Sequence, residues 1–322
     1  MEPYDGVVSQ YTAFAEEAGD ASPCFAEWGF GVAGDPEVLA WVDALPGLKK
    51  QPNLVFAAAR FHGVPAPGPY AGLREALLGD DGSIRATIMA RSTQTNEAGR
   101  LATLLPAFAL AVPAGPVALL EVGASAGLNL YPDRWGYEWS TSAGPRTLGP
   151  EPRLGCLVVG DAPLPTTLPE VGWRGGIDLN PLSVTDPDDV AWLELLVWPE
   201  EDDRRERLRH AVEIARRDPP RLVRGNLLDE LPALVAEAAS YGEVLVFHSA
   251  VAAYLTTEDR ARMREMLLGL VADRTCHWVS NEAVGVFPEL AAPEPPSWRF
   301  QLTVDGTAVG FTHGHGHELT WL

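Results

Sequence analysis

Residues 117–130 read VALLEVGASAGLNL, an apolar run that ends in an acidic residue and leads into a loop of small residues. The run Val117–Val122 has the composition of a buried strand, and Gly123, Ser125 and Gly127 follow it at alternate positions. Such small residues let a ligand come close to the backbone. We expect a helix after the loop, with its first N–H groups facing that ligand. The segment therefore predicts a strand, a ligand-binding loop and a helix in an α/β protein.

Short apolar runs alternate with helix-like stretches after this segment. We expect further strands at 175–179, 221–224, 244–248 and 277–280, and helices at 188–197, 204–216, 231–239 and 258–270. This alternation predicts a doubly wound, mostly parallel, Rossmann-like sheet. Residues 299–311, with Asp305-Gly306 at the turn, predict an antiparallel C-terminal hairpin that brings the sheet to seven strands.

Two other regions have different patterns. Residues 1–95 read as helices joined by Gly/Pro loops, and we expect a helical N-terminal lid region there, followed by the α/β domain over 96–322. Residues 131–173 are rich in Pro, Gly and Trp, with a strand expected at 156–159, and predict an inserted flap. The aromatic side chains of the flap either line a substrate pocket or form a small core of their own.

Composition restricts the partners. The 322 residues carry a formal net charge of −20, so nucleic acid is an unfavourable partner, whereas small molecules and basic or neutral proteins stay open as substrates. We see neither a signal peptide nor an apolar run of about 18 residues, and therefore expect no membrane association. Three isolated cysteines fit a reducing cytoplasm, and Lys restricted to Lys49 and Lys50 suggests an actinobacterial genome. The oligomeric state stays open.

Two nucleotide-binding motifs fit the loop poorly. A dinucleotide fingerprint starting at Gly123 would need glycines where Ser125 and Leu128 stand, and the phosphate-binding Gly-Lys-Ser/Thr motif is absent. The loop instead resembles the first motif of class I S-adenosylmethionine (SAM) dependent methyltransferases, which matches Glu121, Gly123, Ser125 and Gly127 with serine at the middle position. The resemblance implies that Glu121 orients the loop or contacts the methionine amino group.

Later segments extend this resemblance over residues 96–322. Asp178, after the second expected strand, resembles the acidic residue that binds both ribose hydroxyls, and a carboxylate suits two adjacent hydroxyl donors. Its separation from Glu121 exceeds the usual spacing of about 20 residues because the flap intervenes. Asn226 and Leu227 stand where that family contacts adenine, with Asn in place of the usual Asp. His248 ends the fourth expected strand, which delivers residues to the reacting methyl group.

A closer resemblance covers almost the whole chain. The stretches PNLVF at 52–56, TQTNEAGR at 93–100, LVWPE at 196–200 and FHS at 247–249, together with Asn129 in the Glu121 loop, resemble an actinobacterial family known as domain of unknown function 2332. This resemblance implies a fold and leaves the substrate open. We count Asn129 among the cofactor-binding residues.

Several polar residues have two interpretations. His248 either accepts a proton from the substrate or is hydrogen-bonded beneath the site, and Glu282 and Tyr254 are the next candidates for a base. Asn96 and Arg100 either contact the cofactor from a lid segment or belong to a stretch that caps a helix. His313, His315 and His317 would share one face of a strand, but the glycines between them weaken strand character, and we assign no metal.

The leading hypothesis is a SAM-dependent methyltransferase acting on a small metabolite. One alternative keeps bound SAM but performs elimination or cyclisation. Another is a non-catalytic, regulatory SAM-binding protein. A nicotinamide-dependent dehydrogenase is disfavoured by the missing glycines.

Overall fold

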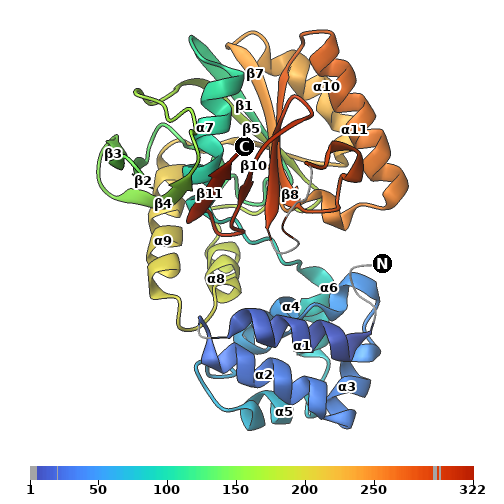
Figure 1. Ribbon diagram of the computed structural model, residues 1–322. Coiled ribbons are helices and arrows are strands. Elements are labelled where there is room, and N and C mark those ends of the chain that lie inside the picture. Colours follow the sequence, from blue (N-terminus) through green and yellow to red (C-terminus); the bar gives the residue numbers. More distant parts are fainter. Residues whose placement is uncertain (1–5, 20, 293–295, 297–298) are drawn as a thin grey trace. The chain divides into compact units, whose positions relative to one another are not determined.

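A computed structural model describes residues 6–19, 21–292, 296 and 299–322 (Figure 1). The chain forms two compact units, which are described separately. Unit 1 contains the residues up to Thr95 together with Thr185–Arg209, and unit 2 contains Asn96–Val184 and His210–Leu322. The sequence analysis placed residues 185–209 in the α/β domain, but their contacts group them with the helical unit. The physical reason is a set of buried polar contacts within unit 1.

Unit 1 is helical in its described residues. Its helices are α1 (Val7–Ala18), α2 (Pro23–Gly34), α3 (Pro36–Asp43), α4 (Pro52–Phe61), α5 (Tyr70–Leu78), α6 (Ser83–Ala90) and α8 (Pro187–Leu196), with the first half of α9 (Asp202–Arg217) and a 3-10 turn at Gly47–Lys50. Phe25 and Phe56 contact edge-to-face at 5.1 Å between ring centroids, and Phe14, Trp28 and Trp198 pack on the same pair or on each other. This aromatic cluster forms the core of the unit.

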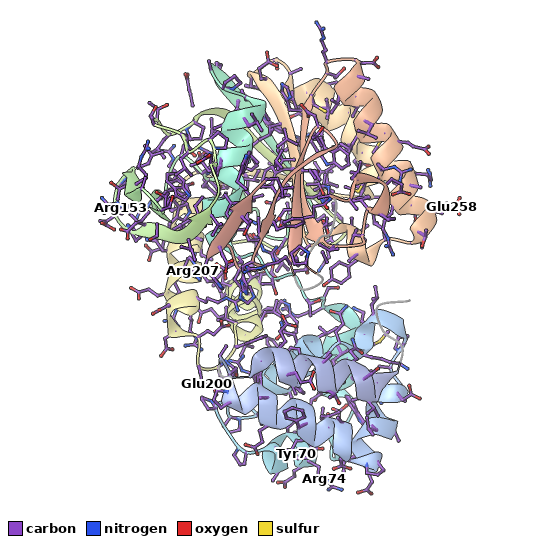
Figure 2. The ribbon with its side chains drawn as sticks, viewed as in Figure 1. Tyr70, Arg74, Arg153, Glu200, Arg207 and Glu258 are labelled. Atoms are coloured by element: carbon purple, nitrogen blue, oxygen red, sulfur yellow. The ribbon has the colours of Figure 1, made fainter. Side chains whose placement is uncertain are left out.

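Polar side chains bind the 185–209 segment within unit 1. Arg60 Nη1 donates to the carbonyls of Leu195 at 2.6 Å and Val197 at 2.9 Å. Burial lowers the pKa of Arg60 to about 10. Because this value is still well above neutral pH, Arg60 remains cationic. Glu200, labelled in Figure 2, accepts from the Ser22 hydroxyl and the Cys24 N–H of the α2 N-terminus.

A second polar contact joins α3 and α5 in the same unit. Tyr70 and Arg74, both on α5 and labelled in Figure 2, donate to Asp35 Oδ2 at 3.1 and 2.7 Å. Asp35 also caps α3 by accepting the N–H groups of Glu37 and Val38. One carboxylate thus fixes the start of α3 against α5.

Unit 2 contains a single mixed sheet of eleven strands in its described residues. The strands are β1 (Pro116–Val122), β2 (Gly136–Thr141), β3 (Gly144–Leu148), β4 (Arg153–Val159), β5 (Glu170–Asp178), β6 (Arg221–Arg224), β7 (Glu243–Ser249), β8 (His277–Ala283), β9 (Phe300–Val304), β10 (Thr307–Thr312) and β11 (Glu318–Trp321). Their order is β3-β2-β4-β11-β10-β9-β8-β7-β1-β5-β6. Seven strands were expected; the four additional ones are β2, β3 and β4 of the flap and the C-terminal β11, which pairs antiparallel with β10 and parallel with β4.

The five strands at one end of this sheet are parallel. β6, β5, β1, β7 and β8 all run in one direction, and β9 then pairs antiparallel with β8. Ala118 and Leu120 of β1 pack in a core with α10 (Leu227–Ala238) and α11 (Thr257–Ala272). Because side chains alternate along a strand, those of Leu119 and Glu121 on β1 point to the opposite face of the sheet. On that other face Phe247 of β7 contacts Phe108 of α7 (Leu101–Ala111) at 5.0 Å between ring centroids, and Figure 1 shows α7 on the side of the sheet away from α10 and α11.

The flap aromatics are buried. Trp135, Tyr137 and Trp139 have exposed fractions of 1% or less, and the Tyr137 and Trp139 rings stack at 5.2 Å between centroids. Trp139 Nε1 also donates to the Ala102 carbonyl at 2.8 Å. These side chains form a small core between the flap and α7, which is the second of the two interpretations given above. Among the described helices, none combines the length and apolarity that a bilayer crossing requires.

Candidate functional site

The chain changes direction within the sheet beside β1. It runs from β1 to β5 and β6 on one side, and then crosses to β7 and β8 on the other side. In open α/β sheets, ligands bind at the carboxyl ends of the strands where such a reversal occurs. Four polar residues lie at that edge, on four neighbouring strands: Glu121, Asp178, Ser249 and Glu282. The sheet therefore brings together residues that are far apart in the sequence.

The loop after β1 has a tightly constrained backbone. Gly123 has a φ of +68°, in the region that favours glycine, and Ser125 also has a positive φ of +52°. The N–H groups of Gly123 and Ala124 donate to the Ile177 carbonyl at 2.8 and 3.1 Å. A Cβ atom at Gly123 would lie 2.4 Å from Val251. The loop thus packs directly on the turn that follows β7.

Asp178 holds this loop from the neighbouring strand. Its Oδ2 accepts the Ser125 N–H at 2.8 Å, and its Oδ1 accepts the Asn180 N–H at 2.7 Å. The side chain is partly exposed. Asp178 therefore lies beside the Glu121 loop, as the proposed binding of one ligand by both residues requires, and it also stabilises the loop itself.

The structure departs from the expectation that a helix follows the loop. Only a 3-10 turn, Leu128–Leu130, is present, after which the chain enters the flap. The Leu128 N–H donates to Asn96 Oδ1 at 2.7 Å, so this N–H group already has a partner. Pro132 disfavours a helical conformation at Tyr131 and so limits the turn to one short segment. The expectation of a helix N-terminus facing a ligand after this loop was therefore wrong.

Glu121 is a buried carboxyl with one partner. Its side chain is 3% exposed, and its Oε1 accepts from Asn129 Nδ2 at 3.0 Å. Glu121 Oε2 and Asn129 Oδ1 are both buried, and neither has a hydrogen-bond partner within the described residues. Burial raises the pKa of Glu121 to about 8; the nearby Asp178 also raises it, whereas the Asn129 hydrogen bond and Arg100 lower it. Glu121 is thus poised to be a neutral acid at pH 7.

The segment before α7 contacts this site. Arg100 is buried, and it donates through Nε to the Gly314 carbonyl at 2.8 Å and through Nη1 to the Ser249 carbonyl at 3.0 Å. Glu97 caps the 3-10 turn Ala98–Arg100 by accepting the Gly99 N–H. The capping role expected at this stretch thus belongs to Glu97, while Asn96 and Arg100 connect the segment to the loops after β1, β7 and β10.

His248 is completely buried, and both of its ring nitrogens are engaged. Trp278 Nε1 lies 3.1 Å from His248 Nε2, and an indole nitrogen can only donate. His248 Nε2 must therefore accept, which places the ring proton on Nδ1, 2.6 Å from Glu282 Oε1. This geometry corresponds to the second interpretation of His248, a histidine hydrogen-bonded beneath the site.

Glu282 completes the same cluster. In addition to His248, its Oε1 accepts the N–H groups of Val251 at 2.9 Å and Ala252 at 3.1 Å. It thereby holds the turn Ala252–Tyr254 after β7, on which Tyr254 is 44% exposed. Of the three residues expected to supply a base, only Tyr254 presents its side chain to solvent.

Two members of this region escaped the sequence analysis. Trp278 fixes the His248 tautomer, and buried Asn281 donates to Ser249 Oγ at 2.9 Å and accepts from Thr312 at 2.7 Å. A signal for Asn281 was present, because Ser280-Asn281-Glu282 places three polar residues at the end of an apolar strand. Nothing in the sequence distinguishes Trp278 from a core residue.

The residues expected at adenine have local roles. Asn226 is exposed and caps α10 by accepting the Leu228 N–H at 3.0 Å, whereas Leu227 is buried in the core of unit 2. The adjacent Gly225 donates its N–H to the Asp178 carbonyl at 3.0 Å, so this segment lies beside the end of β5. The side chains of Asn226 and Leu227 are themselves occupied in capping and packing.

The three C-terminal histidines lie in the turn between β10 and β11 rather than on one strand. The rings of His313 and His317 are 3.6 Å apart between centroids, and those of His313 and His315 are 5.5 Å apart. Across the described ranges, no group of three His, Cys, Asp or Glu side chains has an arrangement that could hold a metal ion.

Comparison with known proteins identifies the family and leaves the activity open. No curated protein and no solved structure matches the chain. Residues 8–321 match the family described as "Uncharacterized protein conserved in bacteria (DUF2332)". The match confirms the closer of the two resemblances drawn from the sequence, and it names no cofactor or reaction. Because it covers nearly all of the chain, this protein belongs to that bacterial family.

Proposed function

We propose that the chain binds SAM at the carboxyl ends of β1, β5 and β7 and transfers its methyl group to a small molecule. The observation that carries this proposal is Glu121, a buried carboxyl whose Oε2 has no partner in the described part of the chain. A buried acceptor of this kind favours a ligand that brings a charged N–H donor. The amino group of SAM is such a donor.

The order β6-β5-β1-β7-β8 supports the Rossmann-like interpretation of the parallel strands, with the ligand placed where the order reverses beside β1. Asp178 would accept the ribose hydroxyls from a position fixed by Ser125 and Asn180. Asn226 and Leu227 follow the next strand, where the adenine is expected. The loop from Gly123 to Gly127 would lie under the methionine part of the ligand.

SAM supplies a methyl group that is already activated, so the chain has mainly to align the acceptor and exclude water. Within this proposal, His248 and Glu282 are positioning residues that hold the turn carrying Tyr254. Because both His248 nitrogens and the Glu282 Oε1 are engaged, a non-catalytic SAM-binding role is the second candidate. Elimination or cyclisation, which requires removal of a proton from carbon, is favoured less by the same observation.

Calorimetric titration with SAM, S-adenosylhomocysteine and NAD tests the binding step. We expect micromolar affinity for SAM and much weaker affinity for NAD; tight NAD binding without SAM binding would refute the proposal. Asp178→Asn should weaken SAM binding by roughly tenfold, the scale of a charged hydrogen bond. The exposed Asp229→Asn on α10 is the matched control and should leave the affinity unchanged.

Incubation with methyl-labelled SAM and a panel of small metabolites then tests the reaction. Transfer of label to a metabolite supports the methyltransferase. Turnover of SAM without transfer of label supports the elimination or cyclisation chemistry. Binding without any turnover across the panel supports the regulatory role.

A further inference from the structure

Two buried acceptor atoms without partners lie in one side-chain pair. Glu121 and Asn129 are joined by the bond from Asn129 Nδ2 to Glu121 Oε1 at 3.0 Å, and the two remaining oxygens, Oε2 and Oδ1, lack partners among the described residues. Leaving a buried oxygen without a hydrogen bond is costly, and the cost is greater for a charged one. If Glu121 were ionised, the site would hold two buried oxygens without donors, and one of them would carry negative charge.

A single proton on Glu121 Oε2 would remove the negative charge and also supply a donor for Asn129 Oδ1. A carboxylic acid and a primary amide are planar groups, each with two polar atoms side by side. When the amide N–H donates to one carboxyl oxygen, a proton on the other carboxyl oxygen can point at the amide oxygen. A protonated Oε2 would therefore supply a donor of the kind that Asn129 Oδ1 lacks, and the pair would then form a ring closed by two hydrogen bonds.

We propose that Glu121 rests as a neutral acid paired with Asn129, and that an ammonium-bearing ligand entering at the end of β1 expels this proton to solvent. The ligand's N–H groups would then replace the proton as donors to the carboxylate. This inference rests on the proposed function only for the identity of the ligand, SAM. It adds that binding and deprotonation of Glu121 are one coupled step.

The charges around Glu121 agree with a neutral resting state. The residues paired with it on the neighbouring strands are Gly176 and Phe247, neither of which titrates. The carboxylate of Asp178 disfavours a second negative charge, and Arg100 favours one, while burial raises the pKa of Glu121 to about 8. Arg100 also donates to two backbone carbonyls, so its N–H groups Nε and Nη1 are directed at these carbonyl oxygens.

Proton release can be measured directly. SAM is titrated calorimetrically into the full chain at pH 7 in two buffers that differ in their heat of ionisation, which gives the number of protons released. A Glu121 pKa of about 8 predicts that binding of the ammonium form of the ligand at pH 7 releases about 0.9 proton from Glu121 per ligand. Glu121→Gln keeps the shape but has no proton to release, and its heats should not depend on the buffer. Glu243→Gln, at an exposed position on β7, is the matched control and should release the same number as the wild type.

The outcomes separate this inference from the proposed function. SAM binding without proton release at pH 7 overturns the inference and leaves the proposed function intact. Absence of SAM binding overturns both the proposed function and the coupling. Carbon-13 NMR of the free protein then judges the resting pair: a Glu121 carboxyl that is protonated at pH 7 supports it, and one that is ionised overturns it.

Discussion

Two buried glutamates at neighbouring strand ends have opposite hydrogen-bond environments. Glu282 at the end of β8 accepts from His248 and from two backbone N–H groups, and His248 in turn accepts from Trp278. Glu121 at the end of β1 accepts from Asn129 alone, and one of its oxygens has no partner in the described residues. Burial is similar for the two side chains, at 3% exposure each. The difference teaches that burial alone does not distinguish the two carboxyls, whereas their hydrogen-bond partners do.

The largest effect is expected from Glu282→Ala. The change leaves His248 Nδ1 and the N–H groups of Val251 and Ala252 without their acceptor in a buried region. We expect a loss of about 4 kcal/mol in the free energy of unfolding, measured by urea denaturation. A loss below about 1 kcal/mol would mean that Glu282 is not a structural carboxyl and would erase the contrast with Glu121.

A smaller effect is expected from pH acting on Glu121. Its pKa is raised by burial to about 8 in the folded protein, from an ordinary value of 4.5. Between these values the folded protein holds a proton that the unfolded chain has lost, so the stability from Glu121 is complete below about pH 4.5 and declines as the pH rises to about 8. From about pH 5 to about pH 7.5 the decline is roughly 3 kcal/mol.

The comparison with Glu121→Gln isolates this decline. Other groups titrate equally in both proteins, so the difference in unfolding free energy between them should shift in favour of the variant as the pH rises. Glu243→Gln, which removes an exposed carboxyl, should follow the wild type. Parallel stability curves for wild type and Glu121→Gln would show that Glu121 is ionised in the folded protein.

The smallest effect is expected from Trp278→Phe. It removes the single donor to His248 Nε2 and retains most of the buried ring, so the expected loss is about 1 kcal/mol plus a packing term of similar size. Nitrogen-15 NMR should show His248 protonated on Nδ1 and not on Nε2 in the wild type. An Nε2-protonated ring in the wild type would contradict the assigned tautomer and return His248 to the list of candidate bases.

Much of unit 2 could be read from the sequence because its strands are strongly patterned. The expected strand at 221–224 is β6, and those at 117–122 and 244–248 lie within β1 and β7. Helix α2 contains three glycines, which locally disfavour a helix. In the structure, a Cβ at Gly29 would lie 2.8 Å from Ala15 Cβ and one at Gly31 would lie 2.4 Å from the Tyr70 ring, so the glycines permit close helix packing. Packing here overrides local propensity.

Strand β3 of the flap and the C-terminal strand β11 were harder to predict for a different reason. β3 (Gly144–Leu148) is short and polar and contains a proline, and β11 (Glu318–Trp321) has only four residues. Neither has the alternation of a half-buried strand on its own. They become strands because β3 pairs with β2 and β11 with β4 and β10, and such pairing partners are invisible in local sequence.

The sequence by itself determined strand β1, the acidic residue near its end and the small-residue loop that follows, because the pattern of apolar residues and the size of each side chain are local properties. Only the tertiary structure decided what each polar residue does. Asn129 lies eight positions after Glu121 and becomes its one partner through a turn, while Trp278 and Glu282 reach His248 from another strand. A hydrogen bond requires its donor and acceptor atoms to be positioned to within a few tenths of an ångström, and the two groups can be far apart in the chain. For that reason the sequence could name Glu121, Glu282 and His248 together, and only the fold could distinguish Glu121, whose Oε2 has no partner among the described residues, from the hydrogen-bonded pair of Glu282 and His248.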